Sequence, residues 1–100
     1  MANEGPARTA VEAYLRERFP DAQRISDGSH GDRSTHWWRV TTPTIEVLLH
    51  VSIEFLRDHS PATIAARLAE WAVSDALKSA APARFVIVTG AGCREEQWLR

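Results

Sequence analysis

Residues 35–55 read THWWRVTTPTIEVLLHVSIEF, and their pattern predicts the hairpin at the centre of the fold. Within residues 44–55 apolar residues alternate with others, and the side chains of a strand point to its two faces in turn. Strict alternation therefore predicts a strand with one face on the core. Residues 35–41 read as its antiparallel partner, joined to it near Pro43. The predicted core face of the second strand carries Ile45, Val47, Leu49, Val51, Ile53 and Phe55.

Two adjacent tryptophans, Trp37 and Trp38, lie in the first of these strands, so they must point to opposite faces of the sheet. A hairpin connection of two or four residues predicts that Trp38 faces Val47 on the core side. In the same register, Trp37 faces Leu48 on the other side. Trp38 is therefore expected in the core, and Trp37 on the second face.

The second face of the hairpin is the candidate binding site. In the predicted register Arg39 lies opposite Glu46, and opposite charges across an antiparallel pair stabilise it by roughly 0.2–1 kcal/mol. Thr35 lies opposite His50. Three alternatives are open for this face: the protein's own first helix or C-terminal tail covers it, another protein or a second copy binds it, or it holds a small ligand or a reaction site. Protein interfaces are enriched in Trp and Arg. The candidate binding residues are Trp37, Arg39, Glu46, Leu48 and His50.

Helices are expected on both sides of the hairpin in sequence. Apolar residues recur every three or four positions in residues 6–19 and again in residues 60–79. Pro6 suits the first turn of the first helix, and Pro20 ends it. Ser60 is a suitable N-cap for the second helix.

The remaining segments complete an α+β prediction. Residues 84–89, RFVIVT, predict a strand buried on both faces. A helix between the hairpin and this strand predicts a parallel, right-handed crossover. Residues 20–34 read as a loop with a short strand near 24–26, and residues 93–100 as a short helix or a frayed end. The expected fold is a two-layer α/β sandwich in the order α-β-β-α-β, with a mixed sheet that joins an antiparallel hairpin to a parallel last strand.

Composition limits the class of protein. One hundred residues suit one small globular domain over 1–100, with 1–5 and 93–100 as frayed ends. The formal net charge of −1 argues against a dedicated nucleic-acid binder. One cysteine, Cys93, excludes an intramolecular disulfide and a cysteine-based zinc site within one chain. Neither a secretory signal nor an apolar stretch of about 20 residues is found, so the expected location is the cytoplasm, without membrane contact.

Histidines raise a metal hypothesis, because imidazole and carboxylate side chains bind zinc and iron. Their spacing, with Asp27 and Asp32 nearby, fits no known ligand motif. In the predicted register His36 and His50 point to opposite faces of the hairpin. No metal site and no cofactor are therefore expected. The histidines are His30, His36, His50 and His59.

Two short motifs contain the residue types of enzymes. Asp58-His59-Ser60 has the residues of a hydrolase triad, but adjacent residues rarely converge in that geometry and Ser60 is expected to cap a helix. VTGAG at 88–92 is similar to the opening of a dinucleotide-binding turn, but its third glycine is absent. These glycines are expected to end a strand. No catalytic residue is expected, and a non-enzyme is favoured, with an enzyme of unnamed reaction left open.

With the strand near 24–26 counted, the element order becomes α-β-β-β-α-β, which resembles the restriction-endonuclease-like core. Such nucleases place an acidic-x-Lys pair on the central hairpin to hold Mg²⁺ and activate water. Here the strand reads Glu46-Val47-Leu48, and Lys78 is the single lysine of the chain. The resemblance covers topology alone and implies a shape without the nuclease active site.

The sequence thus predicts a small non-catalytic module that binds a protein partner or a second copy of itself, with a homodimer expected. The alternative is a nucleic-acid-binding domain with a nuclease-like core that lacks the catalytic motif. An exposed Trp37 beside Arg39 would favour the alternative, because aromatic and guanidinium groups stack on single-stranded bases.

Overall fold

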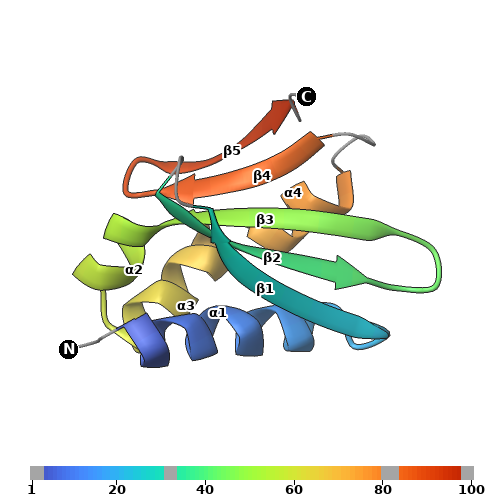
Figure 1. The fold of residues 1–100 in the computed structure, drawn as a ribbon, viewed down its shortest axis with the longest axis horizontal. Coiled ribbons are helices and arrows are strands. Elements are labelled where there is room, and N and C mark those ends of the chain that lie inside the picture. The colour runs from blue at the N-terminus through green and yellow to red at the C-terminus, as the bar shows by residue number, and fades with distance from the viewer. Residues whose placement is uncertain (1–3, 31–33, 80–83, 98–100) are drawn as a thin grey trace.

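The computed structural model describes residues 4–30, 34–79 and 84–97 (Figure 1). In these described ranges, four helices and five strands follow one another. Their bounds are α1 Glu4–Arg18, β1 Arg24–His30, β2 Thr35–Thr41, β3 Glu46–Ser52, α2 Ile53–Asp58, α3 Pro61–Glu70, α4 Val73–Ser79, β4 Arg84–Thr89 and β5 Gly92–Gln97.

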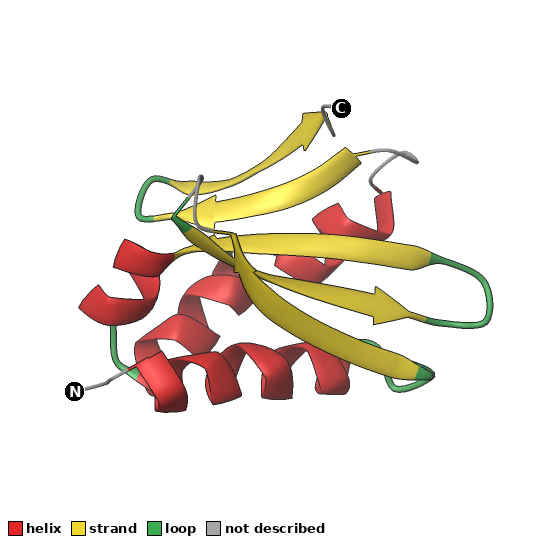
Figure 2. Ribbon diagram, in the orientation of Figure 1, coloured by secondary structure: helices red, strands yellow, loops and turns green. Residues whose placement is uncertain are grey.

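The strands form one mixed sheet in the order β1-β2-β3-β4-β5. Strands β3 and β4 run parallel, and the other neighbours are antiparallel. The helices gather on one side of this sheet (Figure 2). The predicted α+β class, its hairpin and its parallel crossover to residues 84–89 are therefore confirmed. The short strand expected near 24–26 is the start of β1, which is longer than predicted and replaces much of the expected loop.

One hydrophobic core joins the helices to the sheet. Trp38 is almost fully buried in it, as its face of the hairpin predicts. All four helices contribute buried side chains to the same cluster, which places them on the same face of the sheet. The cluster consists of Ala7, Val11, Tyr14, Leu15, Phe19, Trp38, Val40, Val47, Leu49, Val51, Phe55, Leu56, Ile64, Leu68, Val73, Leu77, Val86 and Val88.

The hairpin register differs from the prediction by two residues. Trp38 lies opposite Leu49, not opposite Val47. The reason is the turn, in which the Thr42 N–H donates to the Ile45 carbonyl at 2.8 Å and leaves Pro43 as the first central residue. Proline is favoured at that position, whereas the predicted register put it at the second central position, where it is disfavoured. A shift of two residues keeps every side chain on its predicted face.

Strand β3 ends earlier than the alternation predicts. Ser52 caps helix α2 by accepting a hydrogen bond from the Phe55 N–H at 3.3 Å, so residues 53–55 are helical and not extended. Phe55 still reaches the core, from a helix instead of a strand. Ile45 was expected on the core face, but it lies in the turn and is 39% exposed.

The helix predicted over residues 60–79 is two helices. Ser60 caps α3 as expected, but the helix is interrupted at Ala72, whose φ of +52° is outside the helical region. The Tyr14 hydroxyl binds backbone groups on both sides of this interruption. It donates to the Leu68 carbonyl at 3.2 Å and accepts from the Ser74 N–H at 3.0 Å. A side chain of α1 thus replaces backbone bonds that an unbroken helix would make.

The segment that starts at Cys93 was expected to be a short helix or a frayed end, and this is wrong. It belongs to β5, an edge strand paired with β4 along its length. Gly92 begins this strand with φ +130°, a conformation that glycine adopts readily. Helix α1 likewise starts at Glu4, inside the end expected to fray, while residues 1–3 and 98–100 lie outside the described residues. No helix within the described part of the chain is long and apolar enough to cross a membrane.

Candidate functional site

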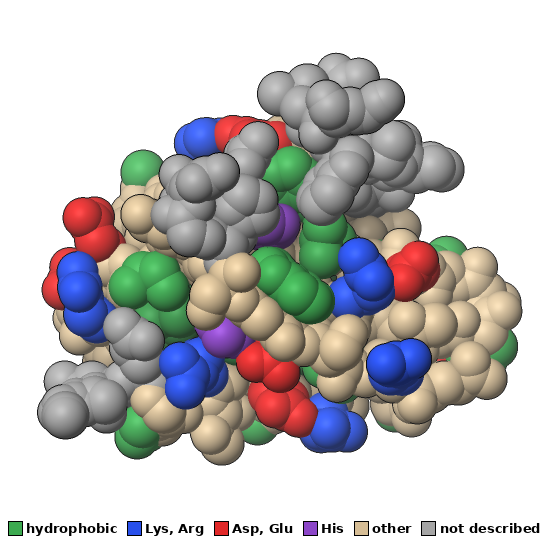
Figure 3. Space-filling view, viewed as in Figure 1, with side chains coloured by type: hydrophobic (Ala, Val, Ile, Leu, Met, Phe, Trp, Pro, Cys, Tyr) green, Lys and Arg blue, Asp and Glu red, His purple; other side chains and the backbone are tan. Residues whose placement is uncertain are grey.

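The candidate site lies on the sheet face opposite the helices, called here the outer face. Trp37 and Arg39 reach it from β2, and Leu48 and His50 from β3, because these residues alternate with the buried core positions. On the face drawn in Figure 3, hydrophobic and histidine side chains come to the surface among basic and acidic ones.

Trp37 lies on the outer face against Gly28 of the neighbouring strand. The two residues are direct partners in the β1–β2 pairing. A Cβ on Gly28 would stand 2.7 Å from Cζ2 and 3.0 Å from Cε2 of the indole, closer than real Cβ contacts. The missing side chain of glycine therefore makes the space in which the ring lies, and Trp37 is half-buried.

Arg39 extends over the same tryptophan. Its Cζ lies 5.8 Å from the centroid of the Trp37 ring, within cation–π range. Its Nε lies 3.5 Å from Oε2 of Glu46, and the two side chains are 50% and 58% exposed. The predicted Arg39–Glu46 contact exists, but it is diagonal, because the shifted register pairs Arg39 directly with Leu48 and Glu46 with Thr41.

Leu48 and His50 differ in how deeply their side chains are buried. Leu48 is half-buried, beside Arg39. His50 is 2% exposed, lies opposite Trp37 instead of Thr35, and packs its ring 4.5 Å from that of Phe85. Its Nδ1 is 3.0 Å from the Thr35 hydroxyl.

The reachable part of the predicted site is therefore smaller than expected. His50 is buried beneath it. The four remaining side chains are called the Trp37 surface: Trp37, Arg39, Glu46 and Leu48.

A second pair of polar residues was not expected from the sequence. Nε2 of His36 lies 2.7 Å from Oδ2 of Asp27, which joins β2 to β1 on the core side. The His36 ring also packs 4.7 Å from that of Trp38. The signal was present in the pairing of β1 with β2, which sets Asp27 opposite Trp38, but β1 was predicted too short to include it.

Metal binding finds no support in the described residues. His36 and His50 do point to opposite faces of the hairpin, as predicted. No group of three or more His, Cys, Asp or Glu side chains in the described ranges comes together to hold an ion. The side chain of His30 and residue Asp32 lie outside what the structure describes.

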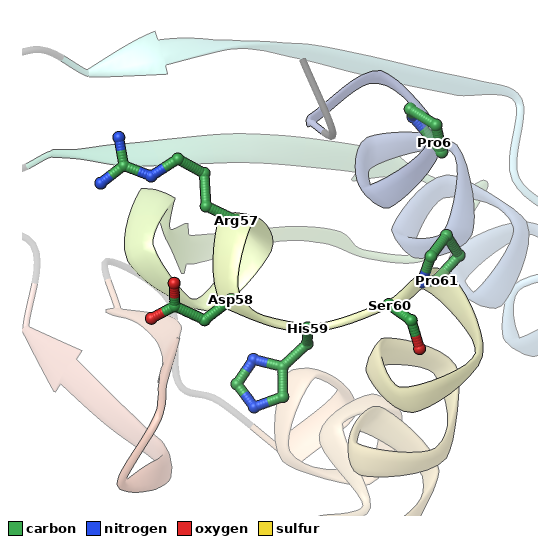
Figure 4. A pocket seen from close by; sticks show the side chains of 6 residues that line it. All are labelled: Pro6, Arg57, Asp58, His59, Ser60 and Pro61. Carbon is green, nitrogen blue, oxygen red and sulfur yellow. The ribbon is translucent and has the colours of Figure 1, made fainter. Parts of the chain in front are cut away.

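A hollow of about 370 Å³ lies where α1 begins beside the α2–α3 connection (Figure 4). The Ser60 hydroxyl there accepts from the Thr63 N–H at 3.2 Å as the cap of α3. Nδ1 of His59 lies 3.0 Å from the Phe55 carbonyl, so it donates there. Asp58 and Ser60 point to different sides of His59 in Figure 4. These three side chains therefore do not converge as those of a triad would, and Ser60 caps α3 as expected. The hollow is lined by Pro6, Arg57, Asp58, His59, Ser60 and Pro61.

The glycines of VTGAG end a strand, as predicted. Thr89 pairs with Gly92, which leaves Gly90 and Ala91 as the turn between β4 and β5. Cys93 follows, half-buried, with its thiol 3.8 Å from the Trp71 carbonyl. Burial raises the pKa of this thiol above its ordinary value and favours the unreactive neutral form.

No family model, no curated protein and no solved structure matches this chain.

Proposed function

We propose that this protein is a small non-catalytic module that binds a protein partner through the Trp37 surface. The observation that carries this proposal is the one-sided arrangement of the helices. They pack on one face of the sheet, and half-buried Trp37 and Leu48 lie on the other, beside the exposed charges of Arg39 and Glu46. An aromatic and aliphatic centre with a charged rim is typical of protein interfaces.

The chemistry of the four side chains supports binding over catalysis. They supply an indole ring, an aliphatic chain, one guanidinium and one carboxylate. Trp37 is held against Gly28 and under Arg39, so little of its rotational freedom remains to be lost on binding. A rigid aromatic side chain of this kind suits an interface anchor.

A cytoplasmic location is part of the proposal. Its support is the use of one cysteine in the whole chain, Cys93, with a thiol that is free and half-buried.

One observation favours the nucleic-acid alternative. The Arg39 guanidinium lies over the Trp37 ring, and such a pair can stack on unpaired bases. The carboxylate of Glu46, 3.5 Å from Arg39, would repel a phosphate backbone at the same place. Titration with a single-stranded oligonucleotide at low salt tests the alternative. Salt-sensitive binding that Arg39→Ala abolishes would favour it over a protein partner.

Site-directed photo-crosslinking tests the proposed function. A photoreactive phenylalanine analogue replaces Leu48 in one variant and the exposed Ala66 of α3 in a control. We expect protein adducts of higher mass from position 48 in expressing cells, and none from position 66. A folded variant that gives no adduct from position 48 would overturn the proposal.

A further inference from the structure

We propose that the partner is a second copy of this chain, related by a two-fold axis that sets Arg39 of each copy against Glu46 of the other. This inference rests on the proposed function and names the partner of the same surface.

Charge makes the Trp37 surface complementary to itself. Arg39 and Glu46 carry opposite signs on one small patch, and both are about half exposed. A strongly acidic or strongly basic partner would attract one of them and repel the other. A second copy related by a two-fold axis matches both charges. The axis that sets Arg39 of one copy against Glu46 of the other also sets Glu46 of the first copy against Arg39 of the second. The formal net charge of −1 leaves little repulsion between copies.

Within one chain, the contact between Arg39 and Glu46 is loose. Its shortest N–O distance is 3.5 Å, against 2.6–2.8 Å in three other arginine–carboxylate pairs. Charge-assisted hydrogen bonds are about 2.7–2.9 Å long. The carboxylate of Glu46 in a second copy could therefore bind the terminal nitrogens of Arg39 without breaking a strong internal bond. The other pairs are Arg16–Glu12, Arg67–Glu70 and Arg94–Glu96.

The register puts an apolar side chain next to the proposed axis. Leu48 lies directly across from Arg39 and two residues from Glu46 on β3, so it neighbours both. A two-fold axis that lies in the plane of the interface, midway between Arg39 and Glu46, passes beside Leu48. The Leu48 side chains of the two copies therefore meet at this axis. Trp37 lies two residues further along β2 and borders this contact. The arrangement buries the apolar centre and pairs the charges around it.

The burial of neighbouring side chains on the outer face limits the area, and therefore the strength, of the proposed dimer interface. Phe85, His50 and Ile87 are buried on the outer face within one chain, so they add little to a new interface. A small interface predicts a weak dimer, with a dissociation constant roughly in the micromolar range. The mass must therefore be measured up to high protein concentration.

Charge reversal in separate copies tests the pairing. Sedimentation equilibrium measures the dimerisation of wild type, Arg39→Glu, Glu46→Arg and an equimolar mixture of the two variants. We expect each variant alone to dimerise at least tenfold more weakly, because each of its dimers holds two like-charge contacts. The mixture is expected to regain wild-type dimerisation, since both contacts between the two different copies are again of opposite charge.

Matched controls separate pairing between copies from effects within one chain. Reversal of Arg67 and Glu70, whose side chains are 46% and 59% exposed on α3, gives variants of the same charge that are expected to dimerise like wild type. A mixture that stays as weak as its components would overturn the proposed pairing. Wild type that stays monomeric throughout would overturn self-association, whereas adducts from position 48 with other proteins would leave the proposed function standing.

Discussion

The indole of Trp37 rests on the backbone of Gly28, so close that a Cβ at residue 28 would stand 2.7 Å from the ring. This contact explains how two adjacent tryptophans fit into one strand. Trp38 enters the core, and Trp37 lies across the neighbouring strand with Arg39 over it. The glycine thus fixes the position of the aromatic group of the Trp37 surface.

Gly28→Ala is expected to displace Trp37. The ring is rigid and has the strand beneath it, so the added methyl group costs about 1–3 kcal/mol of unfolding free energy, as overpacking usually does. Denaturant unfolding with tryptophan fluorescence measures this cost. Gly90→Ala is the matched control, because nothing lies within 4 Å of a Cβ at residue 90. Equal stability of the two variants would show that Trp37 does not depend on Gly28.

Tyr14→Phe is expected to destabilise the break between α3 and α4. Loss of the hydroxyl leaves the Leu68 carbonyl and the Ser74 N–H without their tyrosine partner in a buried place. The expected loss is about 2–6 kcal/mol of unfolding free energy, since each of the two buried groups left unsatisfied costs roughly 1–3 kcal/mol. Thr9→Val is the control, because it removes an exposed hydroxyl hydrogen bond at 3.0 Å and is expected to change little. A loss below about 0.5 kcal/mol for Tyr14→Phe would contradict this account.

Cys93 is expected to make the protein less stable at alkaline pH. Burial raises the pKa of its thiol above 9.0, so the folded state favours the neutral thiol more than the unfolded state does. The resulting stabilisation is fully present below that pH and is lost as the pH rises through the higher folded-state pKa. Unfolding of wild type and Cys93→Ala from pH 7 to 10.5 checks this. The unfolding free energy of wild type should fall relative to that of Cys93→Ala as the pH rises above about 9, and a difference that stays constant over this range would contradict the raised pKa of the thiol.

The alternation of apolar residues predicted the sheet face of each side chain in β2 and β3 correctly, but it did not predict which residues pair across the two strands. It placed Trp38 inside and Trp37 outside, and both assignments hold. The direct pairing of Arg39 with Glu46 failed because the position of Pro43 in the turn, and not the alternation, sets the register. The two charges still meet, because diagonal neighbours on a sheet lie within reach of long side chains.

The structural features that the sequence did not predict have only weak signals in their own residues. Strand β5 has the polar sequence GCREEQ, which shows no apolar alternation because it is an edge strand held mainly by backbone pairing with β4. The break between α3 and α4 falls at Ala72, a residue that normally favours helix, so nothing local predicts its φ of +52°. The depth of His50 depends on its packing with Phe85, which is distant in sequence.

Sedimentation equilibrium of wild type, Leu48→Lys and Ala66→Lys over a hundredfold range of concentration tests self-association through the Trp37 surface. Leu48 lies at the centre of the Trp37 surface, and Ala66 is exposed on α3, away from it. We predict that the average mass of wild type and of Ala66→Lys rises with concentration, while folded Leu48→Lys keeps the mass of one chain. Equal masses for wild type and Leu48→Lys at every concentration would contradict self-association through this surface.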